Sequence, residues 1–544
     1  MGMCQVLEAP DEDRNTALFN PVLAAWNGVF RWMVYIDKLY RAEDPQHPMI
    51  AIITTTIYEV GMRREMRNLF CDTPGILEFT ASVWMNGERT AELSSPVPAW
   101  NLADTLNRQP LSSAQNAYVF FAGNEGHVAD SLVRGLRQAA KKHASSLFET
   151  ITYLKLVSGL GVGVETLVRQ ALSKAGVMRA VTRAMVRIWA LDVQHDTIFY
   201  LAPQLGFHMA VSFLEAGTGV DAVRQSVQEG ILEASLNIGP HLNALPAQVT
   251  SLVNAIIGII IPRYIVFRSV TEAVCKSLRA LQSANREAQF ADSKLQHSWN
   301  VLGELARSRE RIKNTLEICA SRSRATCKNC LVTGRKTSFK RCSRCHSAAY
   351  CSTQCQKAAW EAIHKAECAE ISHNYLATAL SHSDASFQKA VVAFDAKRLV
   401  PKLRSLAAQQ YPNILLCRLV LTLDYTESAE PQYSLLDRFN ESSSPHRAVT
   451  FIRYKIRLGE YEEFSILPIA SLWIEGEVGG EVSGLEVEDF DVREVLDDVA
   501  ERVSCVAVVR RVEERNPVTK YSGNISHAFR TSSSSGPSQP EVYR

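Results

Sequence analysis

Residues 327–368 read CKNCLVTGRKTSFKRCSRCHSAAYCSTQCQKAAWEAIHKAEC. Seven cysteines and one histidine in this stretch follow the pattern C-x2-C-x11-C-x2-C-x5-C-x3-C-x8-H-x3-C. Because Zn²⁺ prefers four thiolate or imidazole ligands in a tetrahedron, eight such side chains supply two complete ligand sets. The pattern therefore predicts a small domain built around two structural zinc ions. The predicted ligands are Cys327, Cys330, Cys342, Cys345, Cys351, Cys355, His364 and Cys368.

The spacing of these ligands also predicts their local backbone. Each Cys-x2-Cys pair suits a tight turn that aims both sulfurs at one point, whereas ligands four residues apart share one face of a helix. Ser352 is placed to cap the helix that contains Cys355. Spacing alone leaves two assignments open. The first four ligands could bind one ion and the last four the other, or the pairs could interleave.

Two other readings of the cysteines were weighed. A disulfide framework requires export, but the chain begins MGMCQVLEAPDEDR, which lacks the charged start and apolar stretch of a signal peptide. The thirteen cysteines are also an odd number, which favours a reducing compartment, in the cytoplasm or nucleus. The segment CSRCH at residues 342–346 matches a c-type haem attachment motif. Haem attachment also requires export, and the zinc pattern already uses both cysteines.

The order and spacing of the eight ligands resemble the MYND-type zinc finger, together with Tyr350-Cys351, Cys355-Gln356 and Trp360. The resemblance implies interleaved binding, with Cys327, Cys330, Cys351 and Cys355 on one ion and Cys342, Cys345, His364 and Cys368 on the other. It implies a protein-interaction module that binds short, often proline-containing peptides, with Gln356 and Trp360 lining the peptide groove. Trp360 could instead serve as a hydrophobic plug that steadies the finger helix. The layout, a long helical region followed by a late finger, is similar to fungal MYND-finger proteins.

Catalysis is not expected from this sequence. Two filled tetrahedra leave no open position at which zinc would activate water. A lysine methyltransferase with SET and MYND domains would need an Asn-His-Ser-Cys signature after the finger, and the chain has none. Walker, Gly-x-Ser-x-Gly and His-Glu-x-x-His motifs are also missing from the sequence. The expected function is that of a zinc-binding adaptor and not an enzyme.

Charge suggests an alternative partner. Residues 321–369 hold ten Lys and Arg against two Glu, whereas residues 475–500 hold ten Asp and Glu against one Arg. Counting seven thiolates and two zinc ions leaves the finger with a net charge of about +5. A basic finger could attract nucleic acid or an acidic protein segment. A solvated basic surface that balances the thiolates is the simpler explanation, so nucleic acid is an alternative and not the favoured partner.

Residues 1–285 are predicted to form a helical domain. Apolar residues recur at intervals of three and four, for example in residues 24–40, 118–139 and 177–191. Glycines followed by apolar, helix-forming runs occur at Gly28, Gly75, Gly126, Gly176 and Gly230. Their intervals of 47, 51, 50 and 54 residues resemble armadillo or HEAT repeats, which predicts a solenoid, with an irregular helical bundle as the alternative.

The remaining boundaries follow from changes in composition. A polar helical linker is predicted at 286–320, the finger at 321–372, an α+β domain at 373–510 and a disordered Ser- and Pro-rich tail at 511–544. Within the α+β domain we predict a helix at 385–409, strands at 414–423, 448–456 and 464–473, and a helix at 492–507. The fold class is therefore mainly α, with a zinc finger and a small mixed domain.

Membrane association is not expected. The longest apolar stretch, residues 253–267, is interrupted by Asn254, Pro262 and Arg263 and reads as a buried element. Hydrophobic residues make up 46% of the chain and charged residues 21%, as in chains that build globular cores. The sequence specifies neither the identity of the partner nor the oligomeric state.

Overall fold

The computed structural model describes the chain in segments, and the statements below concern these residues. They are 12–41, 43–44, 47–62, 69, 72–89, 123–141, 147–161, 167–189, 197–217, 219–242, 245–284, 286, 295–322, 324–335, 338–345, 348–368, 381–414, 419–427, 430–437, 450–458, 461–469 and 507–511. The chain divides into an N-terminal unit, residues 1–212, and a C-terminal unit, residues 213–544. Each unit is described by itself.

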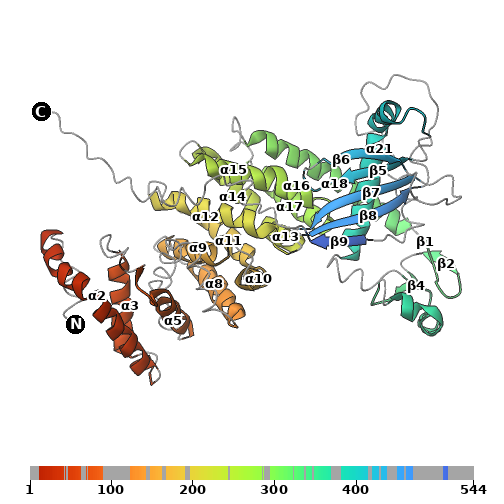
Figure 1. Ribbon diagram of the computed structural model, residues 1–544. Helices are drawn as coiled ribbons and strands as arrows, with labels where there is room; N and C mark the ends of the chain where they lie inside the picture. Colours follow the sequence, from red (N-terminus) through yellow and green to blue (C-terminus); the bar gives the residue numbers. More distant parts are fainter. Residues whose placement is uncertain are drawn as a thin grey trace, which may run out of the picture. The chain divides into compact units, whose positions relative to one another are not determined.

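The N-terminal unit is helical throughout its described residues (Figure 1). Its helices are α2 (Glu12–Arg41), α3 (Pro48–Met62), α5 (Ile76–Arg89), α8 (Glu125–Ala139), α9 (Leu147–Gly161), α10 (Leu167–Lys174), α11 (Val177–Trp189) and α12 (Thr197–Leu214), the last of which crosses the division. The helical class predicted for this region is confirmed.

Apolar faces at helical spacing hold this unit together. In α8, Val128, Leu132 and Leu136 are fully buried, and this helix packs against α9, α10 and α11. Gly135 allows the close approach of α9, because a Cβ at this position would lie 2.2 Å from the ring of Tyr153. The spacing of apolar residues seen in the sequence therefore reports real core faces.

The five glycines of the predicted repeat do not occupy equivalent positions. Gly75, Gly176 and Gly230 have positive φ angles of 82°, 75° and 100° and lie directly before helices, as helix-initiating turns require. Gly28 lies inside α2, and Gly126 lies in the first turn of α8. A regular armadillo or HEAT-like repeat therefore stays a prediction.

The C-terminal unit combines a helical layer with a five-stranded sheet (Figure 1). Its long helices are α13 (Val220–Gln228), α14 (Ile231–Ile238), α15 (Ala247–Ala255), α17 (Arg268–Ser283), α18 (Gln296–Arg322) and α21 (His382–Gln410), with short segments η2 (Gly239–His241), η3 (Ile256–Ile260) and α16 (Ile261–Tyr264). The strands are β5 (Leu419–Asp424), β6 (Gln432–Asp437), β7 (Thr450–Leu458), β8 (Tyr461–Ile469) and β9 (Ala507–Arg511).

The sheet runs in the order β6-β5-β7-β8-β9, with β5 and β7 parallel and the other pairs antiparallel. Burial alternates along β5, where Leu419, Leu421 and Leu423 face the core that α21 helps to cover. The three predicted strands correspond to β5, β7 and β8, and β6 and β9 were missed. Of the helix predicted at 492–507, only residue 507 is described, and it begins β9. The sequence of β9, AVVRR, contains two adjacent valines, which favour an edge strand over a helix.

The segment predicted as a linker is part of the packed structure. Leu302, Ala306 and Ile312 of α18 are buried, and α18 contacts both α17 and α21. Arg309 of α18 donates two hydrogen bonds to the Asp395 carboxylate of α21, at 2.9 and 2.7 Å. The Tyr425 hydroxyl donates a third hydrogen bond to Asp395 at 2.9 Å. These hydrogen bonds pair the buried Arg309 guanidinium with a carboxylate, so one face of the charged helix α18 is buried. The compact division of the chain falls at 212/213.

One segment, Ala247–Tyr264, is long and apolar enough to cross a membrane, judged by length and composition alone among the described residues. In this structure 61% of that segment is buried inside the protein. It continues from α15 through the π-helical turn η3 into α16, where Arg263 pairs with Glu215 at 2.9 Å. The segment is a core helix of the C-terminal unit.

Replacing Glu463 by glutamine is expected to stabilise the protein above neutral pH. Glu463 is buried in β8, where it accepts hydrogen bonds from Gln388 at 3.4 Å and Ser465 at 3.1 Å. Burial raises its pKa, so the folded state binds the proton more tightly than the unfolded chain does. The stability linked to this group is therefore present at low pH and is lost as the pH rises through the folded-state pKa.

Glu463→Gln removes this loss, and we expect a gain of about 1 kcal/mol in the free energy of unfolding at pH 8 but not at pH 5. Thermal unfolding at both pH values measures it. Glu462→Gln is the matched control, since Glu462 forms an ion pair with Lys455 at 2.8 Å and its loss should not stabilise. An equal effect of Glu463→Gln at both pH values would contradict the assignment.

Candidate zinc centre

Two small hairpins and a short helix form the framework of residues 324–368. Strand β1 (Arg324–Thr326) pairs with β2 (Thr333–Arg335), and β3 (Lys340–Arg341) pairs with β4 (Ala349–Tyr350). Helix α19 (Thr353–Ala359) continues into the π-helical turn η6 (Trp360–His364), and residues 365–368 are again helical. Each turn and helix presents two of the predicted ligands.

The structure brings the eight predicted ligand atoms into two clusters, and within each cluster they lie within 4.8 Å of one another. The first contains Cys327, Cys330, Cys351 and Cys355, and the second contains Cys342, Cys345, His364 and Cys368. The pairs therefore interleave, as the resemblance to the MYND finger implies and as spacing alone could not decide.

The separations within the clusters fit zinc. Zn–S bonds of about 2.3 Å in a tetrahedron place two sulfurs about 3.8 Å apart, and a sulfur and a nitrogen somewhat closer. The Cys330–Cys351 and Cys351–Cys355 sulfurs are 3.5 Å apart. The Cys342–Cys368 sulfurs are 3.7 Å apart, and Cys345 Sγ lies 3.5 Å from His364 Nε2. Each donor set could therefore hold one structural zinc ion, and its four protein ligands would complete a tetrahedron.

The turn that presents Cys327 and Cys330 contains a residue in a strained conformation. The carbonyl of Cys327 accepts a hydrogen bond from the N–H of Leu331, and the N–H of Cys327 donates to Val332, both at 2.9 Å. Leu331 has a φ of 60° and is the only described non-glycine residue with a positive φ. A left-handed conformation costs such a residue about 1–2 kcal/mol. The turn persists because it directs Cys327 and Cys330 toward one point.

The thiols of each cluster influence one another. Burial raises the pKa of Cys327, but hydrogen bonds from the backbone N–H groups of Cys330 and Cys351 lower it to about 6. By contrast, hydrogen bonds to Cys355 and Cys330 raise the pKa of Cys351 to about 12. Four close sulfurs cannot all lose their protons without a cation between them. Zinc binding must therefore release protons, which makes the affinity fall at low pH.

The second cluster has supporting groups around it. His364 Nε2 faces the sulfurs, while its Nδ1 lies 3.8 Å from the Glu367 carboxylate. Glu367 also pairs with Lys328, which lies between two ligands of the first cluster. At 3.8 Å no hydrogen bond forms between Nδ1 and Glu367, so this carboxylate acts on the imidazole through its charge alone. The two zinc sites are therefore connected through one ion pair between their ligand segments.

The clusters differ in exposure. All four ligands of the second cluster are buried, whereas Cys330 and Cys351 of the first are exposed. The buried aromatic ring of Tyr350 lies 5.9 Å from the ring of His364 and closes the second site on one side. The first site is the one that solvent, chelators and oxidants reach directly.

The helix that joins the two clusters begins as the sequence predicted. The Ser352 hydroxyl accepts a hydrogen bond from the N–H of Cys355 at 3.1 Å, which confirms Ser352 as the N-cap. Gln356 and Trp360 follow on this helix, and both are partly buried. The Trp360 indole packs edge-on against the His364 ring, with 5.9 Å between centroids and an angle of 68°. Its position thus depends directly on the second zinc site.

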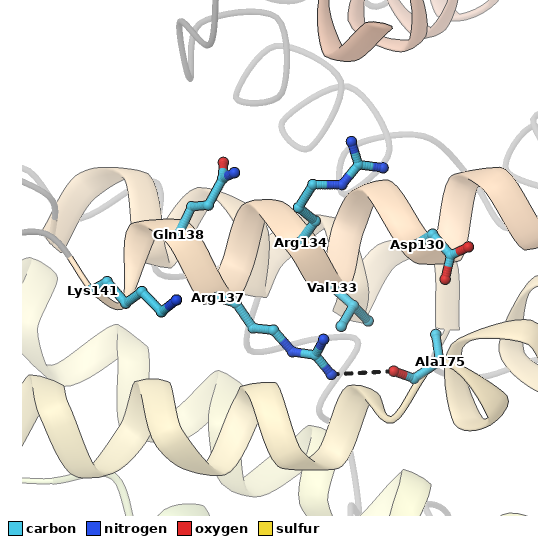
Figure 2. A pocket seen from close by; sticks show the side chains of 7 residues that line it. All are labelled: Asp130, Val133, Arg134, Arg137, Gln138, Lys141 and Ala175. Atoms are coloured by element: carbon cyan, nitrogen blue, oxygen red, sulfur yellow. Dashed lines mark hydrogen bonds between the residues drawn. The ribbon is translucent and has the colours of Figure 1, made fainter. Parts of the chain in front are cut away.

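A separate concave surface lies along α8 in the N-terminal unit (Figure 2). Its volume is about 470 Å³, and its lining residues are Asp130, Val133, Arg134, Arg137, Gln138, Lys141 and Ala175. Arg137 donates a hydrogen bond to the Ala175 carbonyl across the groove at 3.4 Å. Three cations against one carboxylate offer positive charge to an anionic group. This lining includes no cysteine, histidine or serine that would suggest nucleophilic catalysis.

Comparison with known protein families identifies one region of the chain. The family model described as MYND finger matches residues 327–368, the same segment that carries both ligand clusters. No curated relative and no solved structure matches the chain. The likeness of the whole layout to fungal proteins with this finger therefore remains an expectation.

Pairs of ligand substitutions distinguish the interleaved arrangement from a sequential one. Cys330→Ala and Cys355→Ala remove ligands of the same cluster, so the double variant should keep one of the two zinc ions. Cys355→Ala and Cys368→Ala remove ligands of different clusters, so that double variant should lose both. Native mass spectrometry of the purified chain counts the ions directly.

Sequential binding would produce the reverse, with no zinc in the first double variant and one ion in the second. Cys275→Ala is the matched control, because this buried cysteine lies in α17, outside both clusters, and its loss should leave two zinc ions. A parent protein that is folded but contains fewer than two zinc ions would contradict both arrangements.

Proposed function

Since the chain carries a MYND finger with two zinc-binding donor sets, we propose that it acts as a protein-interaction adaptor. The finger would bind short extended peptides, including proline-containing ones, in a groove lined by Gln356 and Trp360. The remaining domains would then position this finger for its partners. We place the protein in the cytoplasm, the nucleus or both, because its ligand thiols must stay reduced.

The position of Trp360 is the observation that carries this proposal. A partly exposed indole is a flat apolar surface that accepts proline rings and other apolar side chains of an extended peptide. Gln356 lies four residues earlier on the same helical stretch, so its amide can hydrogen-bond the backbone of that peptide. Trp360 begins a π-helical turn, a feature found frequently at functional sites.

Zinc contributes to binding by fixing this surface in advance. Cys355 lies in α19, and His364 ends η6, so ligands of both ions flank Gln356 and Trp360 along one helical stretch. A groove that is ordered before binding loses less conformational entropy when the peptide arrives. The affinity for the peptide should therefore depend on the metal, although neither ion touches the peptide.

Nucleic-acid binding is the second candidate. Arg335, Lys340, Arg341 and Arg344 are exposed in and beside the finger hairpins, and the α8 groove carries further positive charge. Such cations bind phosphates through salt-dependent electrostatic attraction. Catalysis is not part of the proposal, because each zinc ion has four protein ligands. A SET-type methyltransferase therefore ranks below both candidates.

Two sets of substitutions separate these functions. Trp360→Ala should weaken binding of a fluorescent Pro-x-Leu-x-Pro peptide at least tenfold, because the apolar floor of the groove is lost. Lys340→Glu with Arg341→Glu should change peptide binding less than threefold. Fluorescence anisotropy at 0.1 and 0.3 M salt measures both, and the peptide affinity should depend only modestly on salt.

The opposite pattern would favour nucleic acid. In that case the parent protein would bind an oligonucleotide, and the affinity would fall steeply as the salt concentration rises. Trp360→Ala would leave this affinity unchanged, whereas the two charge reversals would abolish binding. The zinc content of Trp360→Ala must stay at two ions for the comparison to hold, since Trp360 also packs on His364. Trp360→Phe is the matched control, because it keeps an aromatic surface at this position.

A further inference from the structure

Helix α2 exposes a row of large apolar side chains. Trp32, Tyr35 and Leu39 have exposed fractions of 50%, 64% and 43%. Single exposed apolar residues are ordinary on protein surfaces, but a contiguous group that includes two aromatic rings indicates a contact surface. These three side chains lie three and four residues apart and so share one face of the helix.

This row is separate from the face that α2 buries in its own unit. Trp26, Phe30, Met33 and Ile36 of α2 belong to a core cluster with residues of α3 and α5. The Trp26 indole N–H donates a hydrogen bond to Thr73 at 2.7 Å, and the rings of Phe30 and Phe79 pack edge to face. Figure 1 shows α3 lying beside α2, in agreement with their contacts. The helix is thus apolar on two faces, and the core accounts for one of them.

The exposed face has the spacing of a coiled-coil seam. Ala25 and Gly28 are also exposed and extend the row. The positions 25, 28, 32, 35 and 39 alternate steps of three and four residues, which is the a and d pattern of a heptad. Gly28 has no atom within 4 Å of the position that a Cβ would occupy. This end of the seam is therefore open for the close approach of another helix.

The charges beside the seam are all of one sign. Arg31 and Lys38 are exposed and lie seven residues apart, so both flank the same side of the seam. Asp37 is the only acidic residue between positions 21 and 41, and it is buried and paired with Arg41. A helix packed on this face would therefore meet positive charge and no exposed carboxylate from residues 24–41 of α2.

We propose that this face of α2 binds an amphipathic helix of another protein, one that carries acidic residues beside its own apolar seam. Complementary charges at the flanking positions of paired helices select the partner. A second copy of α2 fits poorly. An antiparallel pair would bring Arg31 and Lys38 of the two copies together. A parallel pair would place Arg31 against Ile36, which the core of the unit already covers, and Lys38 past the end of α2.

The proposed surface is independent of the finger. It uses apolar burial and charge on α2, whereas the peptide groove depends on zinc-fixed side chains near Trp360. An adaptor gains a second binding surface in this way. Loss of either surface should leave the other in place, which makes failure of this inference distinguishable from failure of the proposed function.

The test uses the full-length, zinc-loaded protein and two fluorescein-labelled probe peptides of four heptads. Both have Leu at positions a and d. One carries Glu and the other Lys at positions e and g. Fluorescence anisotropy should show the Glu peptide binding at least tenfold more tightly than the Lys peptide. Trp32→Ala with Tyr35→Ala should weaken binding of the Glu peptide at least tenfold, because the large side chains of the seam are lost.

Charge reversal and the open glycine refine the result. Arg31→Glu with Lys38→Glu should reverse the preference between the two peptides. Gly28→Leu should alter the affinity for the Glu peptide at least threefold. This substitution meets nothing within 4 Å in the fold, and leucine is more favourable than glycine inside a helix, so a thermal midpoint that does not fall separates an effect on binding from an effect on folding. Tyr433→Ala, an exposed aromatic residue of β6, is the matched control and should change nothing.

Several outcomes would overturn the proposal. Equal binding of both peptides would show that the face does not select acidic helices. Binding of neither peptide would show that the face is not a helix-binding site. A dimer that forms at micromolar protein and dissociates in Trp32→Ala with Tyr35→Ala would assign the face to a second copy. Binding to vesicles of phosphatidylcholine and phosphatidylserine that the same variant abolishes, without peptide binding, would assign it to a membrane surface. Trp360→Ala should leave Glu-peptide binding unchanged.

Discussion

Tetrahedral coordination by thiolate and imidazole is the constraint on which the fold of the finger depends. The buried cluster of this domain consists mainly of its own zinc ligands, joined by Ala348, Tyr350 and Ala359. A segment of this length cannot bury enough apolar surface to offset the entropy of ordering its chain. Two zinc ions bound to these ligands would supply that free energy and would at the same time fix α19 and η6, which carry Gln356 and Trp360.

Elsewhere the fold relies on apolar burial, with a few charged groups buried as ion pairs. Arg309 and Asp395 form a bidentate pair supplemented by Tyr425, and Arg263 pairs with Glu215. Buried pairs of this kind contribute little net stability, but the loss of one partner leaves an uncompensated charge. The Arg309–Asp395 pair joins α18 to α21, and the Arg263–Glu215 pair joins α16 to the residue that follows α12. Charge therefore fixes which elements pack together, while burial supplies the driving force.

Much of the architecture could be read from the sequence, and the failures have identifiable causes. Helical spacing predicted the helices of the N-terminal unit, and enrichment in β-branched and aromatic residues predicted β5, β7 and β8. Strand β9 was not predicted, and its first residue was placed at the end of the helix predicted at 492–507, because a short valine-rich run fits either state until a neighbouring strand pairs with it. Helix α18 was read as an exposed linker because its sequence is charged, and no local signal shows that Arg309 has a buried partner 86 residues away. The apolar seam of α2 was also missed, because an apolar residue in a helix gives no sign of which face the core will cover.

The sequence by itself determined the number and chemistry of the zinc ligands, because seven cysteines and one histidine at these intervals match two tetrahedral zinc sites. It also determined the N-cap at Ser352, where the capping side chain and the N–H it binds are three residues apart. Only the tertiary structure decided that the ligand pairs interleave, that Lys328 and Glu367 join the two sites, and that Trp32, Tyr35 and Leu39 stay exposed. The physical reason is the distance along the chain between the residues that interact. Ligand type and capping depend on neighbours along the chain, whereas pairing and exposure depend on which distant segments meet when the chain folds.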